Sequence, residues 1–277
     1  MKKMFALVLC LSLALSLTAC GGEEPEDTPA PPSKEVTVFA AASLEESLTE
    51  IAELYKAVDP DVSLIFSFDS SGTLKKQIAE GATCDLFIAA SQKPMNQLDA
   101  AMDAEKNPDG LDFINSDTRK NLLENKVTLV VPEGNPKGVT SFDQLAQLLQ
   151  SGEVLLGMGN SDVPVGQYTL KIFDYYGLHE EDLAAAGALT YGSNVKEVTT
   201  QVAEAAVDCG VIYATDAFSA GLEVVDTATV ERCGQAIYPA AVLKDAPQAE
   251  AAQAFLEYLA TEPCAEIFEN IGFSMVE

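Results

Sequence analysis

The chain has 277 residues, with 16 lysine and arginine residues against 43 aspartate and glutamate residues, and its formal net charge is −27. A charge of this size repels phosphate backbones and argues against a nucleic-acid-binding protein. Apolar residues make up 48% of the chain, which is too high for a disordered acidic chain and enough for the cores of two domains of roughly 100–150 residues.

The first twenty residues have the pattern of a secretory signal. Two lysines precede an apolar run from Met4 to Leu17, which is too short to span a bilayer comfortably. The run ends in Leu-Thr-Ala-Cys20, and small residues before a cysteine at this distance resemble the bacterial lipobox. We therefore predict a lipoprotein signal peptide over 1–20 and lipidation at Cys20; a plain signal peptide or a buried N-terminal helix are the alternatives.

Residues 21–34 (GGEEPEDTPAPPSK) contain four prolines, four acidic residues and no large apolar side chain. This composition is typical of a solvated, flexible linker. A lipid anchor followed by such a tether predicts an extracytoplasmic protein held at the cell membrane.

Four cysteines follow the linker: Cys84, Cys209, Cys233 and Cys264. Outside the cell they could form two disulfides in three possible pairings, or remain separate buried thiols. No C-x-x-C pair occurs and His179 is the single histidine, which argues against a zinc site. We predict no metal coordinated by side chains and no cofactor.

Strand and helix patterns alternate from residue 35 onward. Strands are expected at 36–39, 62–68, 85–89, 127–131, 154–157, 188–191, 210–213, 224–225 and 236–243. Helices are expected at 44–55, 74–79, around 95–102, and at 141–149, 167–176, 195–206, 248–259 and 264–271. Ser43 and Glu46 fit a capping box at the first of these helices. The alternation predicts an α/β fold with largely parallel sheets, in two lobes joined by short crossing segments.

Four strand-to-helix turns, near Ser43, Ser71, Val165 and Val195, contain small polar, glycine or proline residues. Helix N-termini carry unpaired N–H donors and about half a positive charge. Several such ends facing one cleft would make an anion site without any cation. Every α/β fold has such turns, however, so ordinary turns remain the alternative.

Catalytic motifs are absent: the sequence has no G-x-S-x-G, H-E-x-x-H or Walker A pattern. His179 lies beside three carboxylates, in the pattern of a solvated helix start rather than of an acid–base residue. We therefore predict that the protein is not an enzyme.

Two segments, VTVFAAASL (36–44) and SFDSSGTL (67–74), resemble the molybdate-binding proteins of ABC importers. The resemblance continues through residues 82–90, 163–168, 194–195, 210–217, 238–239 and 267–273, and so covers nearly all of 35–277. It implies a class II periplasmic-binding-protein fold with a ligand cleft between two lobes. Lobe 1 would hold 35–124 and 240–277, lobe 2 would hold 125–239, and two crossing strands would join them.

The resemblance also implies a function and a set of ligand-binding residues. A monomer would capture molybdate or tungstate and deliver it to the permease of an ABC importer. Ser43 and Ser71 would supply hydroxyl and N–H donors, Val165 and Val195 backbone N–H donors, and Tyr213 its phenolic hydroxyl. The negative charge of Asp69 would repel a dianion, so we expect its side chain to face away from the cleft.

Other interpretations of these residues remain open. The same fold could bind another oxyanion, such as sulfate or phosphate. From a different class, the protein could be an extracytoplasmic serine hydrolase that uses Ser43 or Ser71 as its nucleophile. Structurally, the two serines could be helix N-caps, Tyr213 a core aromatic, and the two valines simple packing residues.

Overall fold

The computed structural model describes residues 33–276. The expected signal peptide and Cys20 lie outside the described residues. So does the expected linker, apart from Ser33 and Lys34, and Lys34 already begins the first strand. Within residues 33–276, no helix combines the length and apolar character needed to cross a membrane.

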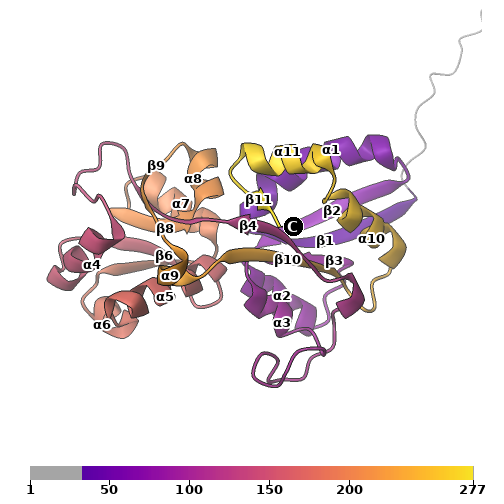
Figure 1. Ribbon diagram of the computed structural model, residues 1–277, viewed down its shortest axis with the longest axis horizontal. Coiled ribbons are helices and arrows are strands. Elements are labelled where there is room, and N and C mark those ends of the chain that lie inside the picture. The colour runs from indigo at the N-terminus through magenta and orange to yellow at the C-terminus, as the bar shows by residue number, and fades with distance from the viewer. Residues whose placement is uncertain (1–32, 277) are drawn as a thin grey trace, which may run out of the picture. The chain divides into compact units, whose positions relative to one another are not determined.

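The first of two sheets has six strands in the order β11-β4-β10-β3-β1-β2 (Figure 1). Their bounds are β1 Lys34–Ala41, β2 Val62–Asp69, β3 Leu86–Ile88, β4 Lys120–Asn125, β10 Ala236–Val242 and β11 Ser274–Met275. β1 pairs in parallel with β2 and β3, whereas β10 and β11 pair in antiparallel fashion with their neighbours.

Helices cover both faces of this sheet because its strands are apolar on both sides. Val38 and Ala40 of β1 belong to the main core, whereas the intervening Phe39 belongs to a smaller core on the opposite face. Side chains alternate along a strand, so adjacent residues serve different layers. The helices of this lobe are α1 Glu45–Val58, α2 Ser71–Ala79, α3 Gln92–Asn96, α10 Ala249–Tyr258 and α11 Glu262–Asn270, with short 3₁₀ helices at Ala42–Leu44 and Ser116–Thr118.

Aromatic packing shows how the main-core layer is built. Tyr55 of α1 meets Phe255 of α10 edge to face, with ring centroids 4.9 Å apart. The smaller core takes Leu74 and Ile78 from α2 and Met95 from α3. Figure 1 accordingly shows α1 and α11 on one side of the sheet and α2 and α3 on the other.

The second sheet has five strands in the order β7-β6-β8-β5-β9. Their bounds are β5 Val127–Val131, β6 Leu156–Gly159, β7 Leu189–Gly192, β8 Cys209–Tyr213 and β9 Glu223–Thr227. The helices of this lobe are α4 Phe142–Ser151, α5 Pro164–Tyr176, α6 Glu180–Ala185, α7 Val195–Ala203, α8 Ala214–Ala220 and α9 Val230–Cys233. β5 and β8 are buried throughout, as expected for central strands covered on both faces.

The chain crosses between the two sheets twice (Figure 1). β4 of the first sheet continues through Lys126 into β5 of the second, and the chain returns between β9 and β10. Residues 236–239, which the sequence analysis assigned to lobe 2, pair with β4 of the first sheet. Sheet membership therefore puts the return crossing between Thr227 and Ala236.

The prediction of largely parallel sheets is wrong, because both sheets are mixed. β10 runs antiparallel to β3 and β4, and β5 runs antiparallel to β8 and β9. β4, β5, β9 and β10 are the strands that adjoin the crossings. They run against their neighbours because the chain traverses from one sheet to the other there instead of returning through a covering helix.

The four cysteines of the described chain are separate buried thiols. Each lies in an apolar core, which matches the second of the two alternatives. Burial raises the pKa of the Cys84 and Cys209 thiols to about 12, so both stay protonated and unreactive at neutral pH.

Candidate oxyanion site between the two sheets

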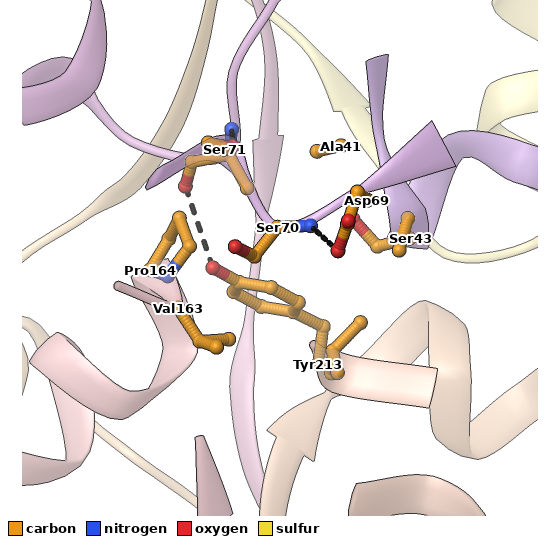
Figure 2. A pocket seen from close by; sticks show the side chains of 11 residues that line it. Ala41, Ser43, Asp69, Ser70, Ser71, Val163, Pro164 and Tyr213 are labelled. Atoms are coloured by element: carbon orange, nitrogen blue, oxygen red, sulfur yellow. Dashed lines mark hydrogen bonds between the residues drawn. The ribbon is translucent and has the colours of Figure 1, made fainter. Parts of the chain in front are cut away.

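A small cavity lies where the two lobes meet (Figure 2). The first lobe contributes Ala41, Ala42, Ser43, Asp69, Ser70, Ser71 and Ala90, and the second contributes Val163, Pro164, Val195 and Tyr213. The volume of the cavity is about 10 Å³. In this conformation the cavity therefore fits a ligand of a few atoms and excludes a sugar or an amino acid.

Three helices begin at this cavity, and the first residue of each lines it. These residues are Ser71 of α2, Pro164 of α5 and Val195 of α7. The N–H group of a first helical residue has no acceptor within its own helix. Neither Ser71 N nor Val195 N donates to an acceptor within residues 33–276. The cavity therefore has two free N–H donors and the positive ends of three helix dipoles in its wall.

Val165 contributes to this arrangement through its backbone alone. The first residue of α5 is Pro164, which has no N–H, so the first donor of this helix belongs to Val165. The Val165 side chain is fully buried in the core and does not line the cavity. Val195, in contrast, does line the cavity.

Ser71 is fully buried and its hydroxyl is fixed by the neighbouring strand end. Its Oγ accepts a hydrogen bond from Ala90 N at 2.9 Å, which leaves the hydroxyl hydrogen free to donate elsewhere. The N-cap of α2 is Ser70, whose Oγ accepts from Thr73 N at 3.1 Å. The interpretation of Ser71 as an N-cap is therefore wrong by one residue.

Ser43 does not cap a helix either, so the predicted capping box with Glu46 is wrong. Ser43 lies in the 3₁₀ helix before α1, and its Oγ is 2.9 Å from the hydroxyl of Tyr238. That hydroxyl accepts from Nδ2 of Asn125 at 3.2 Å. Tyr238 can thus donate to Ser43, and Ser43 is then free to donate its own hydrogen into the cavity.

Tyr213 ends β8 and points its hydroxyl across the lobe boundary (Figure 2). The hydroxyl donates to the backbone oxygen of Ala90 at 3.4 Å, a distance at the outer limit for a hydrogen bond. Burial raises the pKa of Tyr213 well above its ordinary value of 10, so the group keeps its proton at neutral pH. The Tyr213 hydroxyl can therefore donate to an anion in the cavity, which would be a better acceptor than the Ala90 oxygen.

Asp69 lines the cavity, contrary to the expectation that it faces away. Its Oδ1 accepts a hydrogen bond from Ser70 N at 2.6 Å (Figure 2). This bond turns the carboxylate toward the turn before α2 and satisfies one N–H of that turn. The carboxylate thus occupies the Ser70 donor and leaves the Ser71 donor free.

Direct bonds join the two lobes on both sides of the cavity. Gly72 N donates to the backbone oxygen of Asp162 at 3.1 Å, and Lys76 forms an ion pair with the Asp162 side chain. On the other side, Lys196 of α7 pairs with Glu46 of α1. The structure therefore has the lobes in contact around the cavity.

Asp216 lies behind the Lys196 pair and is 1% exposed. Its Oδ1 is 3.4 Å from the Lys196 Nζ, and neither carboxylate oxygen has a hydrogen-bond partner within residues 33–276. Burial raises the pKa of Asp216 to about 7, against the opposing influence of Lys196. Burial also works to lower the pKa of Lys196, but Asp216 and Glu46 raise it above its ordinary value, so the lysine remains charged.

Replacing Gly72 by alanine tests whether the lobes close as described. A Cβ at Gly72 would lie 2.2 Å from the Asp162 backbone oxygen, which belongs to the opposite lobe. We expect Gly72→Ala to weaken ligand binding by about 1–3 kcal/mol, the usual cost of overpacking. Calorimetry measures the affinity, and small-angle scattering checks that the liganded variant stays more open than wild type.

Helix propensity alone gives the opposite expectation for this variant. Alanine is the better helix former by roughly 0.5–1 kcal/mol, so Gly72→Ala would stabilise α2 if the lobes never met there. Unchanged affinity together with increased stability would contradict the closed arrangement.

The arrangement does not suit hydrolysis or metal coordination. The hydroxyl partners of Ser43 and Ser71 are Tyr238 and a backbone N–H, so neither serine is paired with a base. His179, the one histidine, is the exposed N-cap of α6. Among residues 33–276, no group of three histidine, cysteine or acidic side chains could hold a metal ion. What the cavity offers is a set of neutral donors for a small anion.

Several residues around the cavity were not predicted from the sequence to belong to the site. Pro164, Ser70 and Ala90 line it, and Asn125 orients Tyr238 and through it Ser43. The proline after Val163 was a usable signal, because proline is favoured at the first position of a helix. Asn125 gave no signal, since it lies in β4, a strand that the hydrophobic pattern did not predict.

The family model for the bacterial extracellular solute-binding protein matches residues 36–274. The chain belongs to this family. Its members are solute-binding proteins, and the name places them outside the cytoplasm. The match includes every residue that lines the cavity.

Two relatives agree with the resemblance seen in the sequence. The "Putative ABC transporter substrate-binding lipoprotein YvgL" of Bacillus subtilis is 30% identical over 99% of this chain and 98% of its own length. The molybdate-binding protein ModA of Escherichia coli is 32% identical over 87% of this chain and 89% of its own length. The resemblance to molybdate-binding proteins is thereby confirmed.

Solved structures confirm the class II periplasmic-binding-protein fold. The periplasmic molybdate-binding protein of Azotobacter vinelandii has a TM-score of 0.72 at 18% identity and covers 87% of this chain and 100% of its own. The sulfate-binding protein SubI of Mycobacterium tuberculosis has a TM-score of 0.70 at 18% identity and covers 88% of each chain. Binders of two different oxyanions are thus almost equally similar in fold, so the fold alone does not select the ligand.

Proposed function

We propose that this protein captures molybdate or tungstate outside the cytoplasmic membrane and delivers it to the permease of an ABC importer. The ligand-binding residues of the proposal are Ser43, Ser71, Val165, Val195 and Tyr213. The observation that supports it most is the convergence of three helix N-termini and three hydroxyl groups on one small cavity at the lobe boundary.

Neutral donors suit a tetrahedral dianion for a physical reason. The anion has only acceptors, and backbone N–H and hydroxyl groups satisfy them without the desolvation cost of burying a cation beside it. Among residues 33–276, no lysine or arginine lines the cavity. Such a site depends on local dipoles, so it can work within a chain of net charge −27.

Sulfate or phosphate is the second candidate, because a sulfate-binding protein is almost as similar in fold as a molybdate-binding protein. Molybdate and tungstate have longer bonds to oxygen than sulfate has, so rigid donors fit one of these radii best. The relatives that are 30–32% identical over most of the chain include molybdate-binding ModA proteins. This similarity supports the larger oxyanions as ligands.

Calorimetric titration with molybdate, tungstate, sulfate and phosphate at matched ionic strength decides between these ligands. We expect the first two anions to bind and to displace the others. Sulfate binding as tight as molybdate binding would overturn the choice of ligand and leave an oxyanion-binding protein of the same fold.

Replacing Val195 by proline tests the backbone donor itself. Proline is favoured at the first position of a helix, and the preceding Asn194 has the extended φ of −151° and ψ of 174° that a following proline requires. The substitution therefore removes the N–H while α7 keeps its start. We expect molybdate affinity to fall by about 2 kcal/mol, typical of a hydrogen bond to a charged group.

Val195→Ala is the matched control, because it removes the side chain and keeps the N–H. It should bind molybdate nearly as wild type does. Equal affinities of the two variants in calorimetry would exclude the Val195 N–H as a ligand donor.

Three further parts of the proposal concern the whole chain. A signal peptide over 1–20 and lipidation at Cys20 would tether a monomeric protein to the cell membrane through the linker at 21–34. The two lobes would be 35–124 with 240–277, and 125–239, except that residues 236–239 go with the first lobe, whose strand β4 they pair with. The extracellular family and the "lipoprotein" in the name of one relative support this location.

A further inference from the structure

Beside the oxyanion cavity lies a second, larger hollow that also spans the two lobes. Its volume is about 420 Å³, and it is lined mainly by the segment 91–108 of the first lobe and by α5 of the second. Pro164 lines both the cavity and this hollow, and Ser91 of the hollow directly follows Ala90 of the cavity. The two spaces are therefore adjacent.

Three lysines line the hollow: Lys93, Lys106 and Lys171; we call it the lysine groove. Of the residues that the structure describes, Glu105 is the one acidic residue in its lining. The chain as a whole has far more acidic than basic residues, so this grouping reverses the local sign of the charge. Lys106 pairs with Asp103, whereas Lys93 and Lys171 have no carboxylate within 4.0 Å among residues 33–276.

The groove also contains a buried polar atom without a partner. Ser91 is 7% exposed, and its Oγ has no hydrogen-bond partner within the described residues. A buried hydroxyl left unpaired costs free energy unless a ligand or water completes it. Ser91 lies where the groove meets the cavity, directly after Ala90, which lines the cavity.

Tyr168 connects the groove to the cavity physically. Its ring packs edge to face against Tyr213 with centroids 6.4 Å apart, and the Lys171 Nζ lies 4.9 Å from the centroid of the Tyr168 ring. The lysine is thus held along the wall that leads to the cavity.

We propose that the lysine groove is an encounter site for the dianion, through which it reaches the inner cavity. This inference rests on the proposed function. An acidic protein repels a dianion and slows its association, and a local positive groove concentrates the anion at the mouth of the site. The groove acts on the rate of association, whereas the neutral donors of the cavity hold the bound ligand.

The first test measures rates with the triple variant Lys93→Gln, Lys106→Gln, Lys171→Gln. Stopped-flow tyrosine fluorescence at low ionic strength should show molybdate association slowed by about 10-fold with the dissociation rate unchanged. In concentrated salt the difference from wild type should vanish, since screening removes the steering.

The matched control is Lys56→Gln, Lys137→Gln, Lys244→Gln. These lysines are exposed, do not line the groove, and change the net charge by the same amount. Association of the control should stay near the wild-type rate. Equal slowing of both triple variants, or no slowing of the groove variant, would overturn the encounter site.

A second measurement separates this inference from the proposed function. In the Val195→Pro variant, NMR of ¹³C-methylated lysines should still show shifts at Lys93 and Lys171 with millimolar molybdate at constant ionic strength. If the lysine signals shift but molybdate does not bind tightly to wild type, the proposed function is wrong and the encounter site stands. If molybdate binds tightly to wild type but the lysine signals do not shift, the encounter site is wrong and the proposed function stands.

Discussion

Replacing Asp216 by asparagine will make the protein more stable than wild type at neutral pH, and the gain will fade in acid. The buried carboxyl has a pKa of about 7 in the folded protein, against an ordinary value of 3.8. The folded state therefore holds this proton more tightly than the unfolded chain does. The stability that the protonated form contributes is complete below pH 3.8 and is lost as the pH rises to about 7.

The size of the effect follows from the same two values. Each tenfold change in proton affinity corresponds to about 1.36 kcal/mol, so the rise from 3.8 to about 7 amounts to roughly 4 kcal/mol. Asparagine has nearly the same shape and does not titrate. Relative to wild type, Asp216→Asn should therefore gain about that much stability between pH 4 and pH 7.

Urea unfolding at a series of pH values measures this difference. Lys196 and Glu46, the charged groups around Asp216, stay in place in the variant. Asp182→Asn is the control, because it makes the same substitution at an exposed position on α6 and shows what the substitution alone does to the curve. If the curve of Asp216→Asn runs parallel to wild type, the carboxyl does not titrate in this range.

Ser71→Ala should lower both molybdate affinity and the stability of the unliganded protein. The hydroxyl hydrogen that is free to bind the anion is lost, which costs about 1.5–3 kcal/mol of affinity for a bond to a charged group. In addition, the Ala90 N–H loses its only acceptor in a fully buried position, at a cost of about 1–3 kcal/mol of stability.

Calorimetry and urea unfolding separate the two effects. Ser47→Ala is the matched control, because Ser47 is a buried serine of the same lobe that bonds the Leu44 backbone and does not line the cavity. It should lose stability and keep wild-type affinity. A Ser71→Ala variant that binds molybdate as wild type does would remove Ser71 from the ligand-binding residues.

Most strands and helices could be predicted from hydrophobic patterns, and the reason is local. Strands such as β5 and β8 are buried throughout, and α4 begins one residue after its predicted start, behind the N-cap Ser141, whose Oγ accepts from Gln144 N. β4 escaped because its sequence, KNLLEN, mixes charged and apolar residues at a crossing point. The mixed direction of the sheets escaped as well, because pairing direction depends on contacts far apart in the sequence.

The candidate site shows the same difference between features set by neighbours in the sequence and features set by distant residues. Ser71 and Val195 could be placed at helix starts because the polar residues before them announce a turn. The roles of the hydroxyl groups could not, since Ser43 binds Tyr238, which is 195 residues away, and Ser71 binds Ala90, 19 residues away. Likewise, Asp69 was expected to face away because of its charge, whereas the adjacent Ser70 N–H holds it at the cavity wall.

By itself, the sequence determined the α/β class, the acidic character and the turns that supply N–H donors, because these depend on composition and on neighbours along the chain. Only the tertiary structure decided that three helix ends meet at one cavity, that Gly72 touches Asp162 of the other lobe, and that three lysines of a strongly acidic chain lie beside the site. These features arise where the chain crosses twice between two sheets, and such a crossing brings together residues that no local pattern relates.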